Sequence, residues 1–240
     1  MHEELPRSVP ARAGFEWVTG AFRLFAKSPL MLAVASGVFM GALLILQFIP
    51  YAGPGLSEIV TPLIVAGFMR AFRTIDEGED PELLQLLAGF QAHAFPLAIV
   101  GAIYLAILVL ILFVMKQMGV DYEALLDSLQ QGARPEDIAG QLEGKLPLLL
   151  LGTALVIPAI AATWYAPALI VFGNARPFLA MSLSLKACLR NWAALLVNGL
   201  ALLPVLLIAL VPLFGMLVVV PVMLGTAYLG YQAMFASKGS

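Results

Sequence analysis

Four residues of this sequence combine a group that could do chemistry with an apolar surrounding. Glu58, His93, Asn191 and Asn198 lie within or at the edges of long uncharged runs. An ionisable or amide side chain inside a membrane span often binds a proton, an ion or a substrate. These four are therefore the candidate functional residues, and each has to be weighed against a purely structural role.

Glu58 and His93 both have a simple structural interpretation. Glu58 follows Pro54 and Gly55 at the expected outer start of a span, where a helix N-terminus and interfacial water favour a carboxylate. The alternative is a ligand for a proton or cation. The only other histidine is His2, whereas haem and metal sites need several ligands. We therefore expect no metal and no cofactor, and we interpret His93 as an interfacial residue.

The two asparagines are seven residues apart and share one face of a helix. Asn198 either bonds a neighbouring helix, as asparagine in a span usually does, or faces a substrate. Asn191 and Ser28 each precede an expected span and are suitable N-caps.

No motif for a reaction is present in the sequence. It has no HExxH motif, no phosphate-binding glycine loop and no paired carboxylates within a span. The single cysteine excludes an intrachain disulfide. The net charge is −2 and no long basic run suggests nucleic acid. We expect a protein that is not an enzyme and has no nucleic-acid partner.

The elements that carry these residues are set by hydropathy. Hydrophobic residues make up 61% of the chain and charged residues 12%, far from the balance of a soluble domain. Residues 191–237 are 47 consecutive uncharged positions. As one helix they would be roughly 70 Å long, against a hydrocarbon core of about 30 Å. The run must cross twice, with a turn at Val211–Gly215.

The whole chain is expected to be all-α, a polytopic membrane protein whose residues 1–240 form one integral membrane domain. Prolines and glycines at Ile49–Gly55 make another turn. The six expected spans are Leu30–Phe48, Leu56–Thr74, Ala94–Met115, Pro147–Gly173, Trp192–Val211 and Phe214–Phe235.

The basic residues indicate the orientation. Ten of them fall on the side of the two termini and three on the other side. This bias predicts a bacterial inner-membrane protein with both termini in the cytoplasm. The opposite side carries an acidic insertion, residues 116–146, with helical signals that include Pro135 after Arg134. It predicts a small two-helix extracytoplasmic cap, which could meet a membrane or extracytoplasmic protein.

Three cytoplasmic segments have apolar stripes at helical spacing and precede a pair of spans. The stripes are Phe15, Val18, Phe22 and Phe25; Leu83, Leu84, Leu87 and Phe90; and Phe178, Met181, Leu185 and Cys188. Amphipathic helices of this kind lie in the headgroup layer. The order of surface helix, span and span predicts three parallel repeats, at about 11–76, 81–175 and 176–236. The expected headgroup contacts are Arg12, Arg23, Lys27, Arg176, Lys186 and Arg190.

Several prolines fall within spans and free backbone carbonyls there. They are Pro62, Pro158, Pro167, Pro204 and Pro221. Such carbonyls can line a cavity, as in transporters with broken helices. The simpler alternative is an ordinary kink. A GxxxG at Gly37 and Gly41 permits close helix contact within the bundle or in a homo-oligomer.

Two main segments, with two others in agreement, carry a resemblance to a known family. Trp164-Tyr165-Ala166-Pro167-Ala168-Leu169 and Ser182–Trp192, with the opening Ala11–Trp17 and the Ile49–Pro54 turn, resemble uncharacterised six-span proteobacterial inner-membrane proteins. More loosely, the chain is similar to the membrane domain fused to some glycerophosphodiester phosphodiesterases. The resemblance implies a lipid or envelope role and supplies no catalytic residues.

Two functions therefore stay open at the level of sequence. The first is a non-enzymatic inner-membrane protein with a scaffolding, assembly or envelope and lipid-homeostasis role, in contact with membrane lipids. The second is a transporter or carrier of a lipid or another amphiphilic small molecule.

Overall fold

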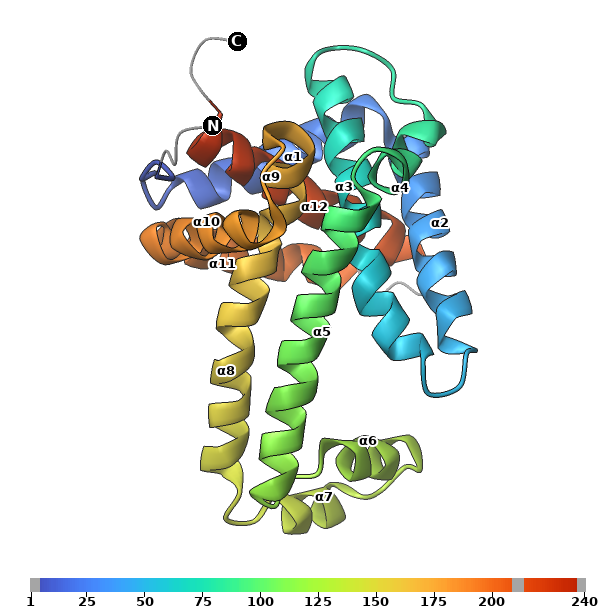
Figure 1. The fold of residues 1–240 in the computed structure, drawn as a ribbon, viewed down its shortest axis with the longest axis vertical. Coiled ribbons are helices and arrows are strands. Elements are labelled where there is room, and N and C mark those ends of the chain that lie inside the picture. The colour runs from blue at the N-terminus through green and yellow to red at the C-terminus, as the bar shows by residue number, and fades with distance from the viewer. Residues whose placement is uncertain (1–4, 209–213, 237–240) are drawn as a thin grey trace. The chain divides into compact units, whose positions relative to one another are not determined.

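The computed structural model of the chain describes residues 5–208 and 214–236, and these contain helices and no strand (Figure 1). The chain divides into two compact units. Unit 1 comprises Met1–Ala102 and Ala161–Ser240, and unit 2 comprises Ile103–Ile160. This division does not follow the expected repeat boundaries, and the threefold repeat stays a prediction.

Unit 1 holds most of the helices. They are α1 (Ala13–Lys27), α2 (Pro29–Gln47), α3 (Gly53–Asp76), the 3₁₀ helix η1 (Leu83–Leu87), α4 (Ala88–Gln91), α9 (Ala166–Gly173), α10 (Pro177–Arg190), α11 (Trp192–Ile208) and α12 (Phe214–Phe235). Unit 2 holds most of α5 (Ala94–Gln117) and α8 (Leu146–Trp164), together with α6 (Tyr122–Gln130) and α7 (Pro135–Leu142).

Five helical segments of the described chain are long and apolar enough to cross a membrane. They are Pro29–Gln47, Gly53–Asp76, Ala94–Gln117, Leu146–Gly173 and Gly215–Phe235. The expected fifth span differs: α11 has 17 residues and reaches the required length only together with α10, from which it is bent by 81°. The chain therefore has five or six candidate spans. Most of the expected turn at Val211–Gly215 lies outside the described residues.

Proline sets where the helices begin. Pro29, Pro54, Pro167 and Pro177 each stand in the first turn of a helix, where the missing N–H costs nothing. For this reason α3 begins at Gly53 and not at Leu56 as expected. The expected cap at Ser28 was wrong in one respect, since its side chain makes no capping hydrogen bond.

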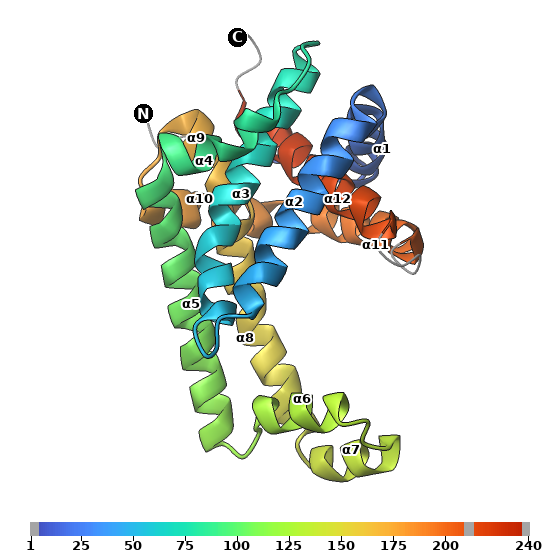
Figure 2. The ribbon, with the colours of Figure 1, turned by 90° about the vertical axis from the view of Figure 1, so that its right-hand side faces the viewer.

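Helix α1 lies against α11 and α12 (Figures 1 and 2). Its buried face is Ala13, Gly14, Trp17, Val18, Ala21 and Leu24. Phe15, a member of the expected apolar stripe, lies outside this buried face and is 58% exposed. The placement of the stripe in the headgroup layer stays a prediction. Small residues such as Ala13, Gly14 and Ala21 allow backbones to approach closely. The face that contains them therefore packs against the other helices.

A chain of aromatic rings runs through the core of unit 1. Phe68 contacts Phe72, with centroids 6.2 Å apart, and Phe72 stacks on Tyr228 at 6.0 Å. Phe172 then contacts Tyr228 at 6.4 Å and Tyr231 at 5.5 Å. Such contacts add to simple area burial, so these rings fix α3, α9 and α12 to one another.

The helices of unit 2 contact one another around a small residue, Gly152. A Cβ at Gly152 of α8 would lie 2.6 Å from the Tyr122 hydroxyl of α6 and 3.3 Å from the Met115 side chain of α5. A larger residue at this position would have to displace the ends of the Tyr122 and Met115 side chains. Lys116 pairs with Asp121 at 3.0 Å where α5 ends. The placement of α6 and α7 outside the membrane, as a cap, stays a prediction.

Candidate functional site

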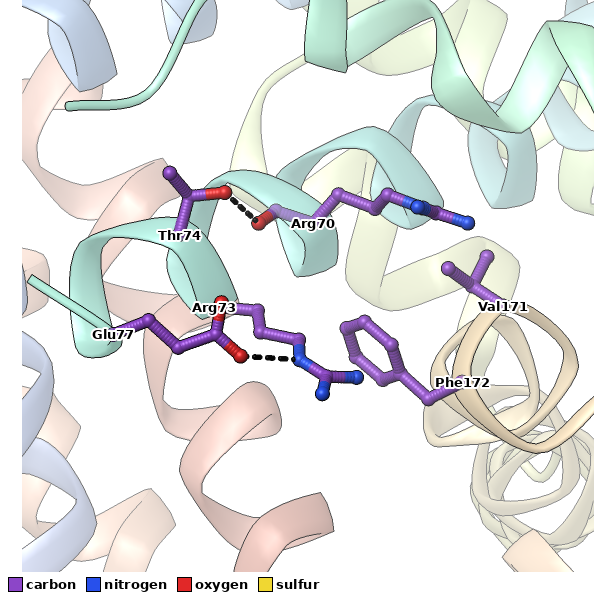
Figure 3. Close-up of a pocket in the computed structure, with 6 residues that line it drawn as sticks. All are labelled: Arg70, Arg73, Thr74, Glu77, Val171 and Phe172. Atoms are coloured by element: carbon purple, nitrogen blue, oxygen red, sulfur yellow. Dashed lines mark hydrogen bonds and ion pairs between the residues drawn. The ribbon is translucent and has the colours of Figure 1, made fainter. Parts of the chain in front are cut away.

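A pocket of about 290 Å³ lies between the last turns of α3 and the end of α9. It is lined by Arg70, Arg73, Thr74, Glu77, Val171 and Phe172. All six belong to unit 1. Figure 3 shows both arginine side chains pointing from α3 toward the two residues of α9.

Arg73 is held in place from two sides. Its Nε donates to Glu77 Oε1 at 2.8 Å, and its guanidinium carbon lies 5.2 Å from the centre of the Phe172 ring. Both members of the ion pair are 53% exposed, so an i,i+4 pair of this kind contributes only about 0.3–0.5 kcal/mol. The hydrogen bond to Glu77 and the cation–π contact with Phe172 together restrain the Arg73 side chain.

Arg70 lies one turn earlier on the same side of α3. Among the described residues, no acidic side chain pairs with it. The nearby hydroxyl of Thr74 donates to the Arg70 backbone carbonyl at 3.2 Å and not to the pocket. The pocket therefore presents two guanidinium groups and only one carboxylate.

Guanidinium groups bind phosphate and carboxylate oxygens in a bidentate manner. Two of them over an aromatic wall suit a small anion that carries an apolar part. Sequence reasoning counted Arg70 and Arg73 only toward membrane orientation and missed them as a site. Their i,i+3 spacing at the end of an apolar span was the signal available.

Asn191 is buried and holds three parts of the chain together. Its Oδ1 accepts from the Val9 N–H at 2.8 Å, and its Nδ2 donates to the carbonyls of Arg7 and Ala187, each at 3.0 Å. The same Nδ2 lies 3.1 Å from the sulfur of Met234. Asn191 directly precedes α11, as expected of its N-cap, and its carbonyl accepts from the Leu195 N–H at 3.1 Å. Its Oδ1, however, bonds the N-terminal segment. We name this arrangement the Asn191 clasp.

Asn198 lies on α11 where α1 approaches most closely. A Cβ on Gly14 would lie 2.6 Å from the Asn198 backbone nitrogen and 2.0 Å from the Ala194 oxygen. The Asn198 side chain is 6% exposed, and its Oδ1 has no hydrogen-bond partner among the described residues. A buried acceptor of this kind is costly and makes Asn198 the least explained of the candidates.

The other two candidates lie elsewhere in unit 1. His93 Nε2 is 3.1 Å from Asn174 Oδ1, which links the start of α5 to the end of α9. Glu58 is half-buried in the second turn of α3, because that helix begins earlier than expected. There, a Cβ on Gly101 would lie 2.5 Å from the Glu58 carbonyl. Neither residue lines the arginine pocket, and the four candidates do not converge on one site.

The helix break before Pro167 is repaired by a serine of α10. Proline cannot donate a hydrogen bond and disturbs the turn before it. The Tyr165 N–H donates to Ser184 Oγ at 3.0 Å, and this hydroxyl donates to the Ala161 carbonyl at 2.6 Å. The Ala161 carbonyl, which loses the Tyr165 donor at this break, is therefore bonded within the protein.

The basic residues expected to contact headgroups are exposed and scattered over unit 1. They are Arg12, Arg23, Lys27, Arg176, Lys186 and Arg190. Arg12 pairs with Glu16 at 3.6 Å, and Lys27 donates to the Ile75 carbonyl at 3.3 Å. None of the six lines the arginine pocket. Among the described residues, no group of three or more histidine, cysteine or acidic side chains could hold a metal ion.

The comparisons with known proteins agree with the membrane class. The chain is 27% identical over 199 residues to a probable inner membrane protein of Burkholderia thailandensis, which covers 80% of this chain and 73% of that protein. No family model matches the chain. No solved structure matches it. The looser likeness to the membrane domain of glycerophosphodiester phosphodiesterases has no support in these comparisons.

Proposed function

We propose that this protein is a non-enzymatic scaffold of the bacterial inner membrane, with both termini in the cytoplasm and a role in assembly or in envelope and lipid homeostasis. Its apolar helices carry it in the bilayer. Its α6–α7 segment meets a membrane or extracytoplasmic protein. The relative in Burkholderia thailandensis, named as a probable inner membrane protein, supports the location.

One observation carries the proposal: the buried polar side chains of unit 1, with the exception of Asn198, bond to backbone groups and do not face a common space. Ser36, Ser57 and Thr226 each donate to a carbonyl of their own helix. Ser184 and Asn191 join separate segments. Breaking these hydrogen bonds would leave polar groups unpaired in an apolar interior, which is costly. The helices that they join are therefore expected to move little relative to one another.

A lipid carrier is the second candidate, and Asn198 is the observation that favours it. Its unpartnered Oδ1 lies on α11, which also contains Pro204. A polar acceptor and a kink on one helix are what a groove for an amphiphile would need. In that case a transported headgroup would supply the missing donor.

The experiment that separates the two candidates uses the full chain, purified from its native membrane in lipid nanodiscs. The scaffold predicts one partner protein in constant ratio, lost in the double variant Asp127→Asn, Glu143→Gln. The matched control is Glu79→Gln, Asp80→Asn, which removes two exposed acids from the segment after α3 and should retain the partner. Lipid exchange between the leaflets of reconstituted vesicles, abolished by Asn198→Leu, would contradict the scaffold and establish the carrier.

A further inference from the structure

We propose that the pocket between α3 and α9 binds the phosphate of an anionic phospholipid headgroup, through Arg70 and Arg73. The inference deepens the proposed function, since it rests on the chain being a membrane protein. It does not depend on the partner protein. Nothing in the sequence motifs or in the named relative assigns this site.

The first argument is the pairing of charge within the pocket. Two arginines and one glutamate line the pocket, so its charged side chains carry one positive charge in excess. Arg73 is bound to Glu77 through Nε alone, which leaves its terminal nitrogens pointing toward Phe172 in Figure 3. A phosphate that enters the pocket can then accept hydrogen bonds from the terminal nitrogens of either arginine.

The second argument concerns what kind of anion fits. Val171 and Phe172 form an apolar wall opposite the arginines. A free inorganic phosphate gains nothing from such a wall, whereas the glycerol and first acyl carbons of a phospholipid bury apolar surface against it. The cation–π contact with Phe172 would still hold Arg73 at the pocket when Glu77 is displaced.

The third argument concerns location. The arginines stand in the last two turns of one candidate span, Gly53–Asp76, and Phe172 stands at the end of another, Leu146–Gly173. Span ends lie at the depth of the headgroups. The C-terminal ends of α3 and α9 carry partial negative charge, so an anion is held here by the arginine side chains and not by the helix ends. Binding therefore needs both arginines.

The test is native mass spectrometry of the full chain, purified from vesicles that contain phosphatidylcholine and phosphatidylglycerol. We expect the wild type to retain phosphatidylglycerol and the double variant Arg70→Gln, Arg73→Gln to retain at least tenfold less. Arg73→Lys keeps the charge but loses the bidentate fork, and it should retain severalfold less. Glu77→Gln removes the competing carboxylate and should retain more.

The matched control is Arg7→Gln, Arg134→Gln, which removes two exposed positive charges that lie outside the pocket and are not among the expected headgroup contacts, and it should retain phosphatidylglycerol as the wild type does. Equal loss in this control and in the pocket variant would overturn the proposal, because general surface charge would then explain binding. Unchanged retention in the pocket variant would overturn it as well.

Competition identifies the source of the phosphate. Added inorganic phosphate should leave the lipid bound, and displacement of the lipid by inorganic phosphate would overturn the lipid assignment. A thermal melt of each variant in detergent shows that it is folded. Partner capture is measured separately from lipid retention. A negative result for the lipid site therefore does not refute the scaffold proposal, and a negative result for the scaffold does not refute the lipid site.

Discussion

The hydroxyl of Ser184 takes the place of the hydrogen bond that the chain loses between Tyr165 and Ala161. In an unbroken helix the Tyr165 N–H would donate directly to the Ala161 carbonyl. Here the serine accepts from the first at 3.0 Å and donates to the second at 2.6 Å. The two segments that carry the family resemblance, Trp164–Leu169 and Ser182–Trp192, therefore contact each other through this hydroxyl.

Ser184→Ala should lower the free energy of unfolding by about 1–3 kcal/mol, because it leaves buried backbone groups without their partner. The measurement is unfolding in mixed micelles of increasing denaturing detergent. The control is Ser182→Ala, an exposed serine of the same helix, which should change stability by less than about 0.5 kcal/mol. Equal effects of the two substitutions would mean that the bridge contributes nothing.

Asn191→Ala should release the N-terminal segment from the Asn191 clasp. The variant leaves the Val9 N–H and the Arg7 carbonyl unpaired, and only the bond from the Arg7 N–H to the Met234 carbonyl, at 2.9 Å, remains. Amide hydrogen exchange at Val9 should become at least tenfold faster. In Ser8→Ala, where the side chain is exposed, exchange at Val9 should not change. Slow exchange in both variants would refute the role of the clasp.

Gly14→Ala should separate α1 from α11. A Cβ there would lie 2.0 Å from the Ala194 oxygen, so the helices must move apart at a cost of about 1–3 kcal/mol. Gly199→Ala is the control, because a Cβ at that position meets nothing within 4 Å. Alanine is favoured over glycine in a helix by about 0.5–1 kcal/mol, so the control should be slightly more stable than the wild type. A stable Gly14→Ala would disprove this close approach.

Asn198→Leu should raise the free energy of unfolding by about 1 kcal/mol, since it removes a buried acceptor that has no partner among the described residues. Asn198→Asp, which keeps the shape but adds a charge, should lower it. Detergent unfolding of both variants provides the measurement. If leucine destabilises the protein instead, the amide has a partner in the membrane, as the carrier hypothesis requires.

Hydropathy and turn residues predicted most of the helices in the membrane class. The first, second, third and sixth expected spans agree with α2, α3, α5 and α12 to within three residues at each end. The reason is that each uncharged run ends at a proline, a glycine or a charged residue, and such residues mark the end of a membrane helix in the sequence itself.

The arrangement of side chains in space was harder to predict. The apolar stripe of α1 was predicted from Phe15 and Val18, whereas the face that packs against other helices is centred on Trp17 and Ala21. Sequence alone shows that a helix has an apolar side, not which neighbour it will meet. The same limit applies to the arginine pocket. It depends on Phe172, about a hundred residues after Arg70, and no periodicity connects the two.

The Asn191 clasp has a consequence for how the protein is made. It joins Arg7 and Val9, near the start of the chain, to Met234, near its end. During synthesis, α1 emerges long before α11 and α12 exist to cover its buried face. The buried face of α1 must therefore be covered by lipid or by an insertase until α12 has been synthesised. In a chain interrupted before that point, α1 lacks its neighbours and can be recognised by quality-control proteases.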